Sequence, residues 1–246
     1  MENMSDRGDV QILHLSEDRL KFQVPVRILF AGPSGSGKST MVLKLLQHRE
    51  RMFNKPFNNV LYCCRPNPSS KDVEFYAQLK LACPLVSISH DFPNFKQLSF
   101  QEGNKLVILD DMLLEIVDNK ELFLAITQAS AHHSISLMIT SQNYYHAGKY
   151  YKTLHRNMTE KIIFVDRGEK RWLSNLSAQM FPQKAQFLPS VMEWIRANVE
   201  GSFNHYFVID SNPQSSLPDS MAVRTRILPQ KNTNQIEPLY FSPRTI

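Results

Sequence analysis

Cysteine is scarce in this sequence, and its scarcity argues against two common kinds of cross-linked scaffold. The chain has only three cysteines, Cys63, Cys64 and Cys83, of which two are sequence neighbours. An odd number of cysteines without a C-x-x-C spacing indicates neither a disulfide framework nor a zinc site. We therefore expect the chain to work in a reducing, intracellular compartment.

Long apolar runs are also missing. No stretch approaches the roughly 18 consecutive apolar residues that a membrane-spanning helix needs. The polar start Met1–Asp9 does not have the character of a signal peptide. We predict that the chain has no membrane span.

An excess of positive charge is present but mild. The 246 residues carry a formal net charge of +5, and the pI is about 9.1. Such a balance permits a nucleic-acid partner without requiring one. Hydrophobic residues make up 42% and charged residues 21% of the chain, as in ordinary globular proteins. The length fits one large α/β domain, or a domain with tails.

Glycine is scarce as well, and its distribution is informative. Three of the eight glycines lie in Gly32–Ser39, which reads Gly-Pro-Ser-Gly-Ser-Gly-Lys-Ser and matches the phosphate-loop pattern G-x-x-x-x-G-K-[ST]. The apolar run Arg27–Ala31 precedes the loop and a helix-like stretch, Thr40–His48, follows it. Glycines let backbone N–H groups approach phosphates, and a helix N-terminus adds positive potential.

The loop predicts a nucleotide-binding site with Mg²⁺, although a merely structural turn is the alternative. Lys38 would supply positive charge to the β- and γ-phosphates, and Ser39 would offer a hydroxyl to Mg²⁺. The chain contains no Asn-Lys-x-Asp sequence to read guanine, which disfavours a GTP switch. The residues expected to bind the nucleotide are Gly32, Pro33, Ser34, Gly35, Ser36, Gly37, Lys38, Ser39 and Thr40.

Short apolar segments alternate with helix-like segments, as is typical of an α/β fold with a parallel sheet covered on both faces. The expected strands are Val26–Ala31, Asn59–Cys64, Leu85–Ser89, Lys105–Asp110, Ile135–Thr140, Glu160–Val165 and, as the last strand, His205–Asp210. The expected helices run from Lys38 to about Arg51, from a cap at Ser69 or Ser70 to about Lys80, and from Asn119 to His132. A further helical segment is expected after the strand Glu160–Val165 and continues through Met180.

The sequence Leu106–Asp111 carries a second chemical motif. Its apolar residues fit a buried strand, and its two acids stand where open α/β sheets bind ligands, at the carboxyl end. We expect Asp110 to hold Mg²⁺, directly or through water, and Asp111 to polarise the attacking water. The competing interpretation is a turn or a helix cap, since Asp suits both.

A third polar cluster ends the apolar strand that begins near Ser136 and reads Thr140-Ser-Gln-Asn143. If this strand lies between the strands that carry the phosphate loop and the acids, Gln142 would face the γ-phosphate. There it could orient water or sense hydrolysis. An ordinary polar strand end is the alternative.

The positive charge is concentrated in one segment of the chain. This segment contains seven basic residues and three acids. Both a solvated surface and a phosphate-binding face remain open interpretations of it. The basic residues are Lys149, Lys152, Arg156, Lys161, Arg167, Lys170 and Arg171, and the acids are Glu160, Asp166 and Glu169.

Composition also predicts the limits of the folded domain. Residues 1–21 are expected to be a polar arm, residues 22–210 the nucleotide-binding domain, and residues 211–246 a tail rich in Pro, Ser, Asn and Gln. Residues 224–228 of the tail could return to the domain.

Two further groups favour packing over chemistry. His132-His133 near a helix end lacks further ligands at metal spacing, so helix capping and core hydrogen bonding are expected instead. Phe92, Phe95 and Phe100 are expected in the core rather than as base-stacking platforms.

Taken in order, these motifs resemble those of the FtsK/HerA-type ATPases that package DNA into viral capsids, the poxvirus-like packaging ATPases. The resemblance is closest to those of Polinton/Maverick elements and of adintovirus-like and related small DNA viruses. It covers residues 22 to 228. Its carrying residues are Gly32–Ser39, Ile108–Met112, Ala131–Ser136, Ser141–Asn143, Lys161–Val165, Leu176–Pro182, Phe207–Asp210 and Arg224–Arg226.

The resemblance implies a P-loop NTPase of the RecA-like (ASCE) type, with a central, mainly parallel sheet and helices on both faces. It implies ATP with Mg²⁺, an oligomeric ring (pentamer or hexamer) that threads double-stranded DNA, and capsid or portal partners. Gln142 falls on the family's polar sensor position, and Asp111 stands where many relatives carry Glu. Arg156 is the expected arginine finger. The implied location is an infected host cell, at a nuclear or cytoplasmic assembly site, or the virion.

Two other function classes remain open at this stage. A nucleotide kinase is one, because Gly32–Ser39 is close to the loops of guanylate kinases. A nucleotide-binding switch or scaffold without hydrolysis is the other. Phosphate transfer to nucleoside monophosphates would indicate the kinase, and DNA-stimulated hydrolysis the motor.

Overall fold

The computed structural model describes residues 10–13, 21–132, 134–164, 170–201, 205–213, 215, 223–230 and 234–243. The chain divides into two compact units, which we describe separately. The parallel unit comprises Lys21–Ala31 and Lys38–Lys161. The antiparallel unit comprises Met1–Leu20, Gly32–Gly37 and Ile162–Ile246.

The parallel unit contains five of the seven strands that the sequence predicts. Its strand order is β2-β6-β5-β3-β4, and every neighbouring pair is parallel. All residues of β5 and β6 are buried, which is why these strands are apolar almost throughout. The strands are β2 (Arg27–Ala31), β3 (Asn59–Cys63), β4 (Val86–Ser89), β5 (Lys105–Leu109) and β6 (Ile135–Ser141).

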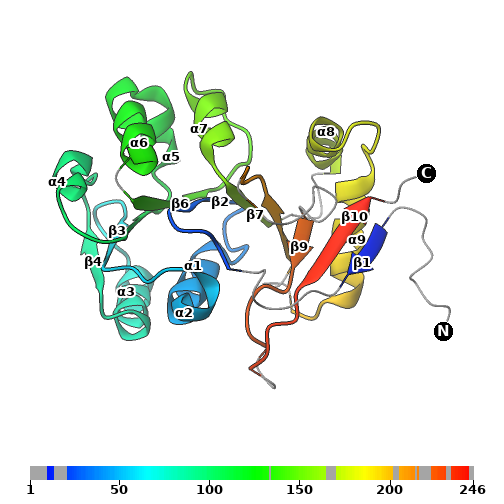
Figure 1. The fold of residues 1–246 in the computed structure, drawn as a ribbon, viewed down its shortest axis with the longest axis horizontal. Coiled ribbons are helices and arrows are strands. Elements are labelled where there is room, and N and C mark those ends of the chain that lie inside the picture. Colours follow the sequence, from blue (N-terminus) through cyan, green and yellow to red (C-terminus); the bar gives the residue numbers. More distant parts are fainter. Residues whose placement is uncertain are drawn as a thin grey trace. The chain divides into compact units, whose positions relative to one another are not determined.

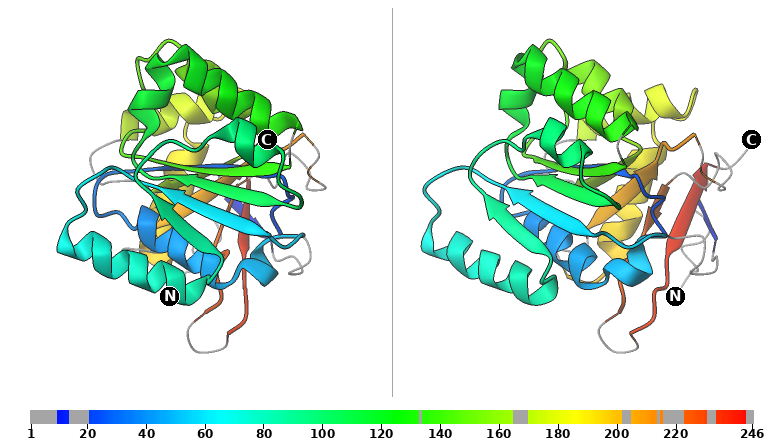
Figure 2. Two further views of the ribbon diagram at one scale, coloured as in Figure 1. Left: turned by 90° about the vertical axis from the view of Figure 1, so that its left-hand side faces the viewer. Right: turned by 60° about the vertical axis from the view of Figure 1, so that its left-hand side comes forward.

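Helices cover both faces of this sheet, as Figures 1 and 2 show. One face carries α1 (Lys38–Gln47), α2 (Arg49–Met52) and α3 (Ser70–Ala82). The other carries α4 (Phe95–Ser99), α5 (Leu113–Asp118), α6 (Lys120–His132) and α7 (Tyr151–Asn157). The predicted α/β class, with a mainly parallel sheet between two helical layers, is confirmed. Strand β6 separates the phosphate-loop strand β2 from the acid-bearing strand β5, which is the RecA-like order.

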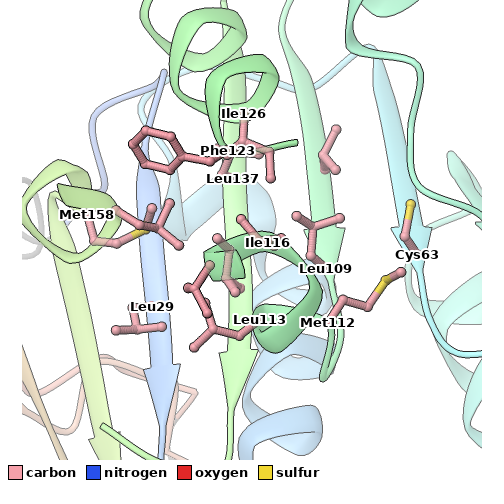
Figure 3. Close-up of a cluster of buried hydrophobic side chains, with 14 of the residues drawn as sticks. Leu29, Cys63, Leu109, Met112, Leu113, Ile116, Phe123, Ile126, Leu137 and Met158 are labelled. Atoms are coloured by element: carbon pink, nitrogen blue, oxygen red, sulfur yellow. The ribbon is translucent and has the colours of Figure 1, made fainter. Parts of the chain in front are cut away.

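The helical layer formed by α4, α5, α6 and α7 packs on the sheet through a cluster of buried apolar side chains (Figure 3). The sheet contributes Leu29, Leu109 and Leu137 to this cluster, from three neighbouring strands. Ile116 of α5 and Phe123 of α6 cover them. Each fully buried side chain of this size contributes about 1.5–3 kcal/mol relative to exposure. The cluster therefore fixes the sheet beneath the strand ends that carry the polar motifs.

Two helix ends test the predicted boundaries. The side chain of Ser69 accepts a hydrogen bond from the N–H of Asp72, and Asp72 reciprocates, so a capping box starts α3 at the predicted place. The predicted helix from Lys38 to Arg51 is interrupted, because His48 has non-helical torsions and separates α1 from α2. Phe100 also differs from prediction: it is 79% exposed, whereas Phe95 is buried and Phe92 packs against the cluster.

The antiparallel unit contains the predicted strand β8 (Tyr206–Asp210) and three strands that the sequence analysis did not predict, β9 (Val223–Thr225), β10 (Leu239–Pro243) and β1 (Val10–Leu13). These strands pair in that order, each antiparallel to the next. The prediction that β8 is the last strand was wrong, because β9 and β10 follow it. The unit also contains α8 (Lys170–Met180) and α9 (Phe187–Asn198), and β7 (Glu160–Phe164) runs from the parallel unit into it.

Large aromatic side chains form the core of this unit. Tyr206, Phe207, Tyr240 and Phe241 are all at least 98% buried. The Trp194 ring of α9 packs edge-on against Phe241, with 5.4 Å between ring centroids. The segment expected to be a tail thus contributes core residues, although its boundary with the nucleotide-binding domain stays a prediction. Among the described residues, no helix combines the length and apolar character that a membrane span requires.

Candidate functional site

The phosphate loop links β2 to α1 through a tight turn. The N–H of Ser36 donates to the carbonyl of Pro33 at 3.2 Å. A Cβ at Gly32 would lie 2.6 Å from both the Cβ and the carbonyl oxygen of Phe164, so no side chain fits there. Gly37 has a φ of 104°, which glycine adopts without strain immediately before the helix. These positions explain why the motif needs glycine for its shape.

The loop contains a buried polar atom that lacks a protein partner. The Ser36 hydroxyl is inaccessible and has no hydrogen-bond partner among the described residues. Such atoms are rare in folded proteins and indicate a missing ligand or water. Helix α1 begins directly after the loop with no acidic residue in its first turn, so its dipole favours an anion. Both features suit a phosphate group.

Lys38 is the first residue of α1 and lies within electrostatic range of both predicted acids. Burial lowers the pKa of Lys38 from its usual value, while the negative charges of Asp110 and Asp111 oppose that shift. Lys38 and the two carboxylates therefore share one edge of the parallel sheet. Ser39 follows Lys38 in the same turn of α1 and is half-buried.

Asp110 follows β5 and is held by two hydroxyl groups. Tyr62 of β3 donates to Asp110 Oδ2, and Thr140 of β6 donates to Asp110 Oδ1 at 2.6 Å. The Tyr62 side chain is buried, and burial together with the Asp110 charge raises its pKa well above the usual range, so it stays a donor. Both oxygens of Asp110 are thus oriented by neighbouring strands.

Asp111 adopts the left-handed backbone conformation, with a φ of 54°. Its N–H donates to Thr140 Oγ1 at 2.8 Å, so Thr140 links the two acids. Gln142, which follows β6, donates from Nε2 to Asp111 Oδ2 at 3.2 Å. The predicted acid and the predicted sensor residue are therefore in direct contact. Asp tolerates the αL region better than most residues do, so this turn can direct the carboxylate without a glycine.

A cation that the sequence analysis missed also contacts Asp111. Arg65 follows β3, and its guanidinium lies 3.8 Å from Asp111 Oδ2 and 3.5 Å from Glu115 Oε1. Tyr62 was likewise missed, and Thr140 was noted only as part of a polar cluster. The only signal in the sequence was that Arg65 closely follows a predicted strand and therefore lies near a strand end. That this strand lies beside β5 is a property of the sheet. The missing information was the strand order.

Arg156 is not brought together with the other predicted catalytic residues. It lies in the last turn of α7, three residues before Thr159, whose Oγ1 accepts from the N–H of Arg27 at 3.1 Å. Arg27 starts β2, whereas the phosphate loop follows the end of β2. A five-residue strand spans about 15 Å, so Arg156 lies at the opposite edge of the sheet from Asp110 and Asp111.

The predicted basic face is smaller than expected. Lys161 is 95% buried and donates from Nζ to the carbonyl of Met158 at 3.1 Å, so it is not a surface charge. Glu160 is buried as well. Lys149, Lys152 and Arg156 are exposed in the parallel unit, and Arg171 is exposed in the antiparallel unit. Asp166, Arg167, Glu169 and the side chain of Lys170 lie outside the described residues, as do His133 and the side chain of His132.

The donor chemistry of the site fits Mg²⁺. The Ser39 hydroxyl and the Asp110 carboxylate supply oxygen, the ligand type that Mg²⁺ prefers. No cluster of three His, Cys, Asp or Glu side chains suited to a metal occurs in the part of the chain that the structure describes. Mg²⁺ is commonly held by one or two protein groups, with phosphate and water completing its shell.

Comparison with solved structures relates this fold to known ATPases, whereas no protein-family model and no curated protein matches the chain. The DNA-packaging ATPase B204 of Sulfolobus turreted icosahedral virus aligns with a TM-score of 0.51 and 14% identity, over 78% of this chain and 96% of B204. B204 from Sulfolobus turreted icosahedral virus 2, in complex with AMP, gives 0.48 and 16% over 77% and 94%. EssC from Geobacillus thermodenitrificans gives 0.39 and 16% over 61% and 34%.

At 14% identity, the alignment with the first of these proteins indicates a shared fold. The shared fold extends over almost the whole of B204. The chain is therefore similar, in its fold, to a P-loop ATPase.

Proposed function

We propose that this protein hydrolyses ATP to ADP and phosphate. The observation that carries the proposal is the contact between Gln142 and Asp111, beside Asp110 and in electrostatic range of Lys38. A phosphate loop, an acid pair and a polar sensor residue are the parts that water-mediated phosphoryl transfer needs. The meeting of Lys38, the acid pair and Gln142 at one edge of the parallel sheet supports hydrolysis over nucleotide binding alone.

The two acids are suited to different tasks. Both oxygens of Asp110 accept hydrogen bonds from hydroxyl groups, which orients the carboxylate toward a cation held with Ser39. Mg²⁺ bound there would neutralise charge on the phosphates. Asp111 Oδ2 accepts from Gln142, and Oδ1 accepts no hydrogen bond from the described residues. We assign Asp111 as the general base because its second oxygen is available.

In the proposed reaction the loop backbone, the first turn of α1 and Lys38 hold the phosphates. The water oxygen forms a bond to the γ-phosphorus while Asp111 accepts a proton from that water. The bond from phosphorus to the bridging oxygen breaks, and ADP departs with the electron pair. Lys38 and the loop N–H groups stabilise the charge that develops on the phosphate oxygens.

We further propose that hydrolysis drives the packaging of double-stranded DNA into a capsid by a ring of these chains. The support is the sequence resemblance to viral packaging ATPases and the shared fold with the DNA-packaging ATPase B204. Two exposed lysines, Lys152 in α7 and Lys149 just before it, could contact DNA phosphates. The narrower kinship with Polinton/Maverick and adintovirus-like proteins, the capsid or portal partners and the location in an infected cell or virion belong to the same proposal.

The position of Arg156 is also consistent with a ring. An arginine at the opposite sheet edge cannot reach the nucleotide of its own chain, but it can reach one bound to a neighbouring chain. Supplied in this way, its planar guanidinium would stabilise charge in the transition state. Arg156 would then make no contribution to ATP hydrolysis by an isolated chain.

The test is phosphate release by the purified chain, with and without double-stranded DNA, over a range of protein concentrations. Lys38→Ala is the control, because it removes the phosphate-binding charge. We expect turnover per chain to rise with DNA and with protein concentration, and Lys38→Ala to be inactive. ATP binding without turnover would favour the switch, and phosphate transfer to an added nucleoside monophosphate would favour the kinase.

A further inference from the structure

The guanidinium of Arg65 bridges two carboxylates at the nucleotide edge of the sheet. Nη1 lies 3.8 Å from Asp111 Oδ2, and Nη2 lies 3.5 Å from Glu115 Oε1. Both ion pairs share this one arginine. Pro66 follows Arg65 directly and restricts the backbone torsions of Arg65.

Asp111 Oδ2 is held from two sides. Gln142 donates to it from β6 at 3.2 Å, and Arg65 approaches it from β3. The backbone of Asp111 is fixed as well, because its N–H donates to Thr140 and its φ is 54°. With Oδ2 occupied, Oδ1 is the oxygen that no described residue binds.

We propose that Arg65 is a positioning residue for hydrolysis: together with Gln142 it clamps Asp111 Oδ2, so that Oδ1 faces the attacking water. This inference rests on the proposed ATPase function. In the step, Oδ1 takes a proton from water as the oxygen–phosphorus bond forms. The bond from the γ-phosphorus to the bridging oxygen breaks, and its electron pair leaves on ADP. Arg65 itself exchanges no proton.

The short side chain of Asp111 explains why a clamp on its carboxylate is useful. Asp is one methylene shorter than Glu, so its carboxylate has a shorter reach, and errors in its direction are less easily corrected. A displacement of about 1 Å in a reacting group can cost about 100-fold in rate. One hydrogen bond from Gln142 and one ion pair with Arg65 act on the same oxygen, and together with the fixed backbone they restrict the rotation of the carboxylate about χ2.

Glu115 has a distinct part in this arrangement. It belongs to α5, whose Leu113 and Ile116 are buried in the core cluster, so its position is set by packing. By pairing with Arg65, it holds the guanidinium in the plane that reaches Asp111. Arginine suits the task because its fork can contact two carboxylates at once, whereas lysine offers a single point charge.

The experiment compares steady-state ATP hydrolysis by the full-length chain and by Arg65→Ala, Arg65→Lys and Glu115→Gln. Lys80→Ala is the control, since it removes one exposed positive charge from α3 at a position remote from the acids. We expect Arg65→Ala to lower kcat about 10-fold or more, with KM changed less than about twofold. Arg65→Lys should recover only part of the loss, and Glu115→Gln should lose less than Arg65→Ala.

A second measurement separates positioning from direct phosphate contact. Binding of a non-hydrolysable ATP analogue should be equal, within about twofold, in the wild-type chain and in Arg65→Ala. Weaker analogue binding in Arg65→Ala would overturn the proposal, because Arg65 would then hold the nucleotide. An unchanged kcat in Arg65→Ala, beside an active wild-type chain, would overturn it as well. A wild-type chain that binds ATP without turnover would instead overturn the proposed function.

Thermal unfolding of each variant guards against a trivial loss of activity. Arg65, Asp111 and Glu115 are half-exposed or exposed, and ion pairs of this kind contribute about 0–1 kcal/mol to stability. We therefore expect the unfolding midpoints of the variants to match that of the wild-type chain. A fall in kcat at an unchanged midpoint would separate positioning from misfolding.

Discussion

The parallel and antiparallel units distribute their polar and apolar side chains in different ways. In the parallel unit, polar groups gather where β3, β5 and β6 end, and Tyr62, Asp110 and Thr140 bond to one another there. In the antiparallel unit the notable side chains are buried aromatics, such as Tyr240 and Phe241. Lys38, the two acids and Gln142 thus belong to the first unit, whereas the second adds the loop residues Gly32–Gly37 to its aromatic core.

The largest expected effect is on turnover, from a change at the polar edge. Asp111→Asn keeps the size of the side chain but removes its ability to accept a proton. We expect ATP to bind while kcat falls by about 100- to 10,000-fold, the usual contribution of a general base. The measurement is phosphate release beside analogue binding. Normal turnover in Asp111→Asn would reject this residue as the base.

A change in the aromatic core of the antiparallel unit should have the opposite signature. Phe241→Ala removes a fully buried ring that packs against Trp194. We expect the free energy of unfolding to fall by about 3–5 kcal/mol, with kcat per folded chain unchanged at low temperature. Denaturant unfolding monitored beside phosphate release checks both expectations. A selective loss of kcat without destabilisation would break the comparison between the two units.

Tyr62→Phe sharpens the comparison, because it changes one hydroxyl at the polar edge and keeps the buried ring. Asp110 would lose its donor from β3 and retain the one from Thr140. Loss of such an orienting group commonly weakens metal affinity about 10- to 100-fold. We expect the Mg²⁺ concentration for half-maximal turnover to rise accordingly. A magnesium titration at saturating ATP measures this, and an unchanged midpoint would mean that Thr140 suffices.

The smallest effect concerns DNA. Lys149→Ala combined with Lys152→Ala removes two exposed charges from the parallel unit. If both contact phosphates, the slope of log affinity against log salt should decrease by about 1.8, or about 0.9 per contact. Lys80→Ala, on α3, serves as the control of equal charge type. An affinity and a salt slope equal to those of the wild-type chain would exclude this segment from the DNA path.

Local signals in the sequence were sufficient for much of the parallel unit. The loop Gly32–Ser39, the apolar run before Asp110 and the capping pair Ser69 and Asp72 each determine structure within a few residues of themselves. The α/β class followed from them, whereas the position of β6 between β2 and β5 was implied by the family resemblance. Lys161 shows the limit of such reasoning, since a lysine in a basic run was taken for surface charge and is buried.

The missed features depend on contacts between residues far apart in the chain. Arg65 and Tyr62 meet the acids only because β3 lies beside β5, and their own neighbours in sequence give no hint of that pairing. Leu239, Tyr240 and Phe241 form a short apolar run between prolines in a polar stretch. Their partners are β9 and β1, and β1 lies at the other end of the sequence. Only the paired sheet reveals them as core.

The pairing of β1 with β10 has a consequence for synthesis of the chain. Val10 pairs with Pro243, so β1 has to wait until nearly all the intervening residues have been made. At about 5–20 residues per second, that wait is about 12–47 s. During this interval the N-terminal segment exposes unpaired backbone groups, which are a template for association with other chains. Slow or stalled translation would therefore extend the period in which nascent chains can aggregate.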